Sequence, residues 1–94
     1  MGFLHLGASQ KLSYDDRELA HLRYVITNKL MKQESFLFTW AKRGRASTVW
    51  VHPSIDLLFE FETDEKHLLN RNWIDLLTSH ANSPGGLRII EEPQ

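Results

Sequence analysis

The chain has 94 residues and a mass of 11.0 kDa, which suits a single domain over residues 1–94. Apolar residues make up 41% and charged residues 24%, a globular balance that excludes a largely disordered chain. The sequence has no cysteine, so disulfides, thiolate nucleophiles and cysteine-ligated metal sites are excluded. No apolar run approaches the length of a membrane span, and the first residues lack a signal-peptide pattern. We therefore expect a cytoplasmic protein with no membrane contact.

The net charge of −1 conceals an uneven distribution along the chain. Residues 1–47 carry eight Lys and Arg against four Asp and Glu, whereas residues 48–94 carry three against eight. If the two halves interleave in one fold, these charges mix. If they do not, the surface is dipolar and favours head-to-tail self-association or a charged partner.

The first third of the chain predicts a strand hairpin followed by a helix. The strands cover residues 2–7 and 11–14, with a turn between them. The helix covers about 15–32, because Asp15 stands at the N-cap position and Glu18 completes a capping box. Apolar residues then recur at helical spacing, namely Leu19, Leu22, Val25, Ile26 and Leu30.

Three further strands are expected over 35–41, 47–52 and 55–62, where apolar side chains recur at every second position. The turns between them are Lys42–Arg45 and Pro53–Ser54. Because both connections are short, we expect consecutive pairing in an antiparallel meander. The side chains expected to face the helices are Phe36, Phe38, Trp40, Val49, Val51, Ile55, Leu57, Phe59 and Phe61.

The last part of the chain predicts a second helix and a final strand. Asn70 suits the N-cap of a helix over about 71–82, and the stop at Asn82–Gly86 precedes a strand over 87–90. Residues 91–94 are expected to fray. The order ββαβββαβ predicts an α+β fold, a two-layer sandwich with both helices on one face of an antiparallel-rich sheet. The inner side of the second helix is expected to hold Trp73, Ile74, Leu76, Leu77 and Ala81.

The alternation leaves apolar side chains on the open face of the meander. The solvent-exposed face of an antiparallel sheet is usually polar. An apolar open face therefore suggests that a partner binds there, or else that the first hairpin or a tail covers it. We therefore expect a non-enzymatic interaction domain that forms a homodimer or binds another protein. The residues expected to bind the partner are Trp50, Leu58, Leu37, His52 and Glu60.

One basic cluster, Lys42, Arg43 and Arg45, lies in the turn between the first two meander strands. Such a cluster can hold phosphate, which gives the alternative function of a DNA- or RNA-associated accessory domain. The expected topology puts this turn near the start of the first helix and Lys29 and Lys32 at its other end. On that topology the basic residues do not line one groove.

No motif for catalysis, metal or cofactor binding emerges from the sequence. No two histidines have the spacing of a helical zinc pair, and no phosphate loop or Gly-x-Ser-x-Gly motif occurs. The carboxylates of Asp15, Asp16 and Glu18 admit a magnesium site, but helix capping accounts for the two key positions. We expect no catalytic residue and no cofactor. The one enzymatic alternative is a site around His52, Asn70 and Arg71.

Four stretches, residues 15–22, 49–54, 69–74 and 81–87, together resemble a family of small uncharacterised actinobacterial proteins of about this length. Members often carry the automated name ATP-dependent DNA ligase. A nucleotidyl-transferring ligase needs a lysine nucleophile in a Lys-x-Asp-Gly motif, and no lysine of this chain stands in one. The resemblance therefore implies no catalytic residues, and it keeps DNA association as the runner-up.

Overall fold

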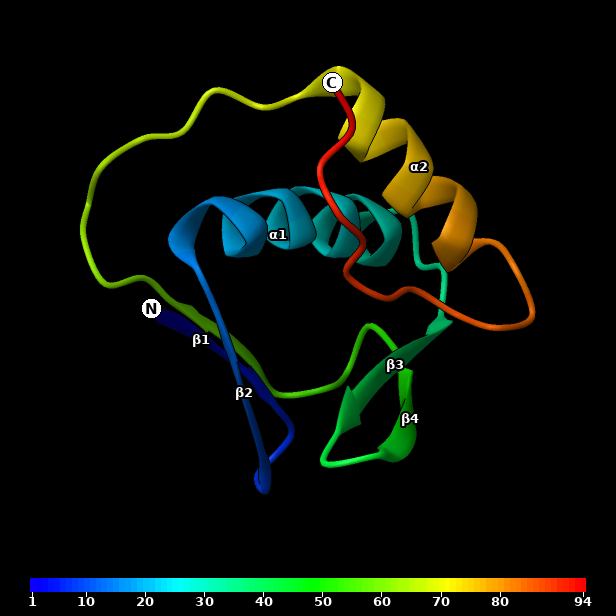
Figure 1. Ribbon diagram of the computed structural model, residues 1–94. Coiled ribbons are helices and arrows are strands. Elements are labelled where there is room, and N and C mark those ends of the chain that lie inside the picture. Colours follow the sequence, from blue (N-terminus) through cyan, green and yellow to red (C-terminus); the bar gives the residue numbers. More distant parts are fainter.

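The computed structural model describes all 94 residues. It contains seven helices and strands in the order ββαβββα. The helices lie together above the strands, so the prediction of a two-layer α+β fold is confirmed (Figure 1). Neither helix has the length and apolarity needed to cross a membrane. The elements are β1 (Gly2–Leu6), β2 (Gln10–Tyr14), α1 (Asp16–Met31), β3 (Phe36–Lys42), β4 (Arg45–Val51), β5 (Leu57–Glu60) and α2 (Arg71–Ala81).

The strands form two sheets instead of one. β1 lies between β2 and β5 in an antiparallel sheet of order β2-β1-β5, while β3 and β4 form a separate hairpin. The predicted meander is therefore wrong at its last strand. In the observed ladder, Leu57 and Phe59 lie opposite the buried Leu6 and Leu4. In this pairing the apolar side chains of β5 pack against the core beside those of β1.

The predicted last strand, 87–90, is reduced to a single parallel bridge between Leu87 and Phe38. The N–H of Leu87 donates to the carbonyl of Leu37 at 2.7 Å, and the N–H of Thr39 donates to the carbonyl of Leu87 at 2.8 Å. After this bridge the chain turns towards the helices, because the indole N–H of Trp73 holds the next residues through the carbonyl of residue 90.

The C-terminal tail, expected to fray, is held in place. Arg17 of α1 binds the carboxylate of Glu92 through two hydrogen bonds. The side-chain amide of Asn70 donates to Glu92 and to the carbonyl of Pro93. A charged pair and a bidentate geometry therefore anchor a segment whose composition alone indicates a loose end.

α1 begins as predicted. Asp15 accepts the N–H of Glu18 at 2.7 Å, and the Glu18 carboxylate accepts the N–H of Asp15, which completes the capping box. The apolar stripe of the helix reaches the core, which contains Leu19, Leu22, Val25 and Ile26 of α1 together with Leu4, Leu6, Phe36, Phe38, Val51, Trp73, Ile74 and Leu77.

α1 also holds both ends of α2 through polar side chains that the periodicity does not single out. His21, fully buried, accepts the N–H of Asn70 at 2.8 Å. Lys29 donates to the side chain of Asn82, the C-cap of α2, and forms an ion pair with Glu34 at 2.9 Å. α1 and α2 therefore run in the same direction, and α1 holds α2 by hydrogen bonds at both its N-cap and its C-cap.

The predicted faces agree with the structure for most side chains. Phe36, Phe38 and Val51 are buried, whereas the others expected to face the helices pack against the core only partly. Leu76 was expected on the inner side of α2 but is exposed. The helix makes its contact with α1 through its other inner residues, and Leu76 falls outside that stripe.

Candidate binding groove

A groove of about 820 Å³ lies between the two sheets; we call it the inter-sheet groove. Consecutive residues of two strands line it, 11–14 of β2 and 39–42 of β3. Consecutive side chains of a strand point to opposite faces, so a hollow that touches all of them runs along the strand edges. Figure 1 shows the turns of the β1–β2 and β3–β4 hairpins at the same end of the molecule.

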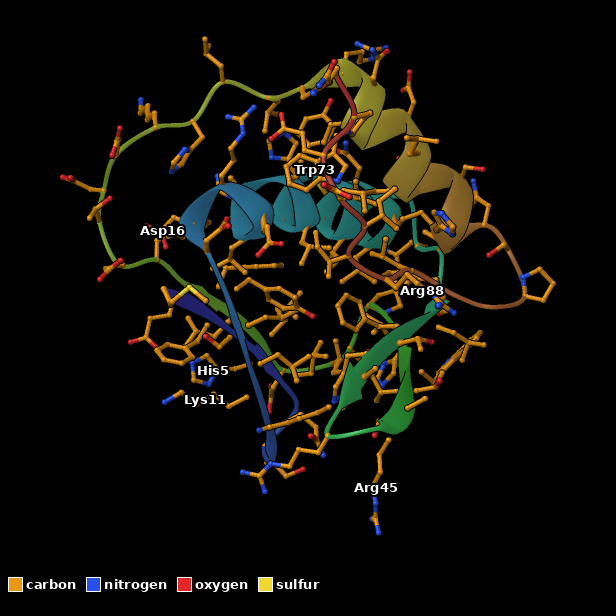
Figure 2. All side chains as sticks on the ribbon, in the orientation of Figure 1. His5, Lys11, Asp16, Arg45, Trp73 and Arg88 are labelled. Atoms are coloured by element: carbon orange, nitrogen blue, oxygen red, sulfur yellow. The ribbon has the colours of Figure 1, made fainter.

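Three cations line the inter-sheet groove, Lys11, Lys42 and Arg88, and no Asp or Glu does. All three are exposed. Figure 2 shows Lys11 and Arg88 on opposite sides of β2, so the positive charge extends across the strand edge and is not focused on one point. Such a spread matches an extended anion better than a single bound ion.

Aromatic side chains form the walls of the groove. Phe3 comes from β1, Tyr14 from β2 and Trp40 from β3. The ammonium of Lys11 lies 4.2 Å from the centroid of the Phe3 ring, a cation–π contact that places charge beside an aromatic surface. Burial raises the pKa of Tyr14 to about 12.

A turn occurs within the predicted segment Lys42–Arg45, and the two strands extend to these two residues. Arg43 and Gly44 both have positive φ, 53° and 76°, which is the signature of a two-residue hairpin turn. Only Lys42 of the predicted cluster lines the groove. Arg43 and Arg45 extend the positive charge at the hairpin tip, and Figure 2 shows Arg45 pointing away from both sheets. Lys29 and Lys32, expected away from this turn, do not line the groove, but Lys42 shares it with Lys11 and Arg88, which the sequence did not single out.

The residues predicted to bind a partner do not share one surface. Trp50 and Leu58 are exposed, 57% and 54%, as the alternation predicted. Trp50 lies opposite Leu37 in the β3–β4 hairpin, and the half-buried His52 follows β4. Leu58 lies in the other sheet, and its neighbour Glu60 pairs there with the imidazole of His5 at 2.9 Å. Glu60, expected on the same face as Trp50, therefore lies in a different sheet, because β5 pairs with β1.

The enzymatic alternative is not supported by the placement of its residues. Asn70 caps α2 and holds the tail, Arg71 pairs with Asp75 at 3.6 Å, and His52 accepts the N–H of Ser54. Figure 1 places the start of α2 and the β4–β5 loop on opposite sides of α1.

The carboxylates near the start of α1 have structural partners. Asp15 caps the helix, and Asp16 accepts the N–H groups of Glu62 and Thr63, both at 3.1 Å. These bonds hold the pKa of Asp16 below its ordinary value. No three His, Asp or Glu side chains gather in a metal-binding arrangement.

A second hollow of about 440 Å³ lies between α1 and the loop that follows β5. Its lining mixes both signs of charge, with Arg23 and Lys66 beside Asp64 and Glu65. The buried Nε2 of His67 has no hydrogen-bond partner there. Because the positive and negative charges of this hollow compensate one another, its lining favours no class of ligand. The inter-sheet groove, with cations alone, favours an anion.

Sequence reasoning missed Lys11, Arg88 and the groove-lining role of Trp40. These residues come from three separate segments, and no local pattern links them. Only the position of β2 beside β3 brings them together.

A family model described as "Domain of unknown function (DUF7882)" matches residues 1–92. Every residue that lines the inter-sheet groove lies within this match. No curated protein and no solved structure matches the chain.

Proposed function

We propose that this chain, which belongs to the family of domains described as DUF7882, binds single-stranded nucleic acid along the inter-sheet groove. The observation that carries the proposal is the lining of that groove. It combines three cations with aromatic side chains and contains no carboxylate. Proteins that bind single strands without sequence preference use this combination, with cations along the backbone and aromatic rings beneath the bases.

The layout of the groove favours a strand over a single small anion. Lys42 belongs to β3 and Lys11 to β2, and Figure 2 shows Arg88 beside β3. An extended polyanion that crosses the edge of β2 therefore meets all three. Phe3 and Trp40 are half-buried, which leaves part of each ring available for stacking. Stacking needs an unpaired base, so a duplex is the weaker ligand.

The resemblance to actinobacterial proteins with a DNA-ligase name agrees with a nucleic-acid ligand but not with ligase chemistry. The chain has no Lys-x-Asp-Gly motif. We therefore propose a binding role with no chemical step, as an accessory domain acting in the cytoplasm.

The test is a titration of a fluorescein-labelled oligo-dT 12-mer followed by anisotropy at low and moderate salt. Affinity should fall as salt rises, because each phosphate neutralised releases bound counterions. The triple variant K11A/K42A/R88A should lose at least tenfold in affinity at low salt and show a shallower salt dependence. The matched control K32A/K66A/R71A removes three exposed cations that do not line the groove and should bind like the parent. Absence of binding at low salt, or equal affinity in the groove variant, overturns the proposal.

A second variant separates stacking from charge. Phe3→Leu keeps an apolar side chain in β1 and removes the aromatic ring. We expect weaker binding of the 12-mer with an unchanged salt dependence. A duplex of equal length should compete poorly with the single strand. If the duplex competes as well as the strand, the aromatic walls have no role and the proposed ligand is wrong.

A further inference from the structure

The outer edge of β4 is free, and this is the longest unprotected strand edge in the molecule. β4 pairs only with β3, and no backbone hydrogen bond outside that ladder involves residues 45–51. Between Arg45 and Val51 the strand has no charged residue and no proline. Folded proteins usually blunt such edges with charges, prolines or a cover, because a free edge pairs readily with another strand.

The ladder identifies which backbone groups of β4 point outward. On β3, the carbonyl of Leu37 and the N–H of Thr39 bond Leu87 on the side away from β4. Their cross-strand partners, Trp50 and Thr48, therefore also direct their backbone groups away from the shared ladder. Alternation adds Ala46 to this set. Three N–H and three C=O groups thus face outward at every second residue.

We propose that two copies of this chain pair through β4 in antiparallel fashion, with the twofold axis at Thr48. In this register Thr48 lies opposite the same residue of the second copy, and Ala46 lies opposite the partner's Trp50. All six outward backbone groups find partners. The two hairpins then become one continuous four-stranded sheet, which resolves the marginal stability of a two-stranded ribbon.

The side chains on the outer face fit this register. Ala46, Thr48 and Trp50 share one face of β4, and Ala41 and Leu37 lie opposite Ala46 and Trp50 on β3. Each Trp50 therefore lies beside two alanines of the partner, so a large ring meets a small-residue surface that leaves room for it. The exposed indole is covered by the pairing, and a cluster of large side chains at the axis is avoided.

The charges also favour a second copy of this chain as the partner of the β4 edge. The basic turn Arg43–Arg45 sits at one end of β4, and an antiparallel twofold places the two turns at opposite ends of the dimer. A parallel arrangement would bring the turns together. The interface shares Ala41 and Ala46 with the lining of the inter-sheet groove, but it includes none of the three cations of the groove.

Sedimentation of the protein alone, from low to high micromolar concentration, should show a shift from 11.0 kDa towards twice that mass. The T48K and T48E chains should each stay monomeric, because the substitution places like charges face to face at the axis. An equimolar mixture of the two should recover the dimer, since opposite charges then meet. The same pair of substitutions at Ser9, in the exposed β1–β2 turn, should leave dimerisation unchanged.

Three results would overturn the proposal. A parent protein that stays monomeric at high micromolar concentration removes self-association altogether. Recovery of no dimer in the T48K and T48E mixture shows that the axis does not pass through Thr48. Trp50→Ala should shift the equilibrium to monomer with an unchanged circular dichroism spectrum. Loss of the fold in that variant would place Trp50 in the core, against the proposal.

Discussion

The guanidinium of Arg17 forms two hydrogen bonds with the carboxylate of Glu92, at 2.8 and 2.6 Å, although 75 positions separate the residues. Asn70 donates a third bond to the same carboxylate. These partners lower the pKa of Glu92 from 4.5 to about 2, first through the Arg17 hydrogen bonds and then through Asn70. One carboxylate therefore connects the start of α1, the start of α2 and the C-terminal tail.

Glu92→Gln should lower the urea midpoint of unfolding at neutral pH. The pKa of Glu92 is lower in the folded than in the unfolded chain, so its ionised form stabilises the fold above about pH 4.5. This contribution disappears as the pH falls towards 2. The midpoints of parent and variant should therefore converge between pH 4.5 and pH 2. Glu91→Gln, at an exposed neighbour, serves as control and should follow the parent; a constant gap for Glu92→Gln across this range would contradict the assignment.

His21→Phe should lower the free energy of unfolding, although the contact between α1 and α2 is otherwise kept. The ring of His21 bonds the carbonyl of Arg17 through Nδ1 and accepts the N–H of Asn70 at Nε2, both at 2.8 Å. Phenylalanine leaves the N–H of Asn70 without a partner, at about 1–3 kcal/mol for a buried polar group, whereas the carbonyl of Arg17 lies within α1 and keeps its place in the helical hydrogen-bond pattern. Chemical denaturation measures the loss. His80→Phe, at a partly exposed site on α2, should change stability by less than about 0.5 kcal/mol.

Gly86→Ala should destabilise far more than Gly85→Ala. Gly86 has φ +83°, and a Cβ there would lie 2.7 Å from the carbonyl oxygen of Leu37. The left-handed backbone costs about 1–2 kcal/mol for a residue with a Cβ, and the backbone contact adds to this. At Gly85 the nearest atom to an added Cβ is a guanidinium nitrogen of Arg88 at 3.9 Å. Equal thermal midpoints for the two variants would show that the Leu87 bridge tolerates displacement.

Asp15→Ala should cost about 1 kcal/mol through loss of the N-cap. The free energy of unfolding in urea gives the value, and Asp64→Ala in the exposed loop after β5 is the matched control. A chelator should leave the melting temperature of the parent unchanged, because the cap needs no ion. A drop in the parent that Asp15→Ala abolishes would instead indicate a bound cation.

Features that depend on neighbouring residues were predictable from the sequence. The capping box at Asp15 and Glu18 uses a backbone group and a side chain three residues apart, so the local order of residues suffices. The turn at Lys42–Arg45 depends on a glycine that accepts positive φ. Alternation placed Trp50 and Leu58 outside the core correctly, because the direction of a strand side chain follows from its parity.

Features that depend on competition between distant segments were decided only by tertiary structure. The short connection after β4 predicted pairing with β4, but β5 pairs with β1, where Leu57 and Phe59 pack against the core. That pairing separates Leu58 from Trp50. The placement of β2 beside β3 likewise gathers Lys11, Lys42 and Arg88 around one groove. Local sequence sets the conformation and parity of each segment, whereas the free energy of packing the whole chain sets which segments meet.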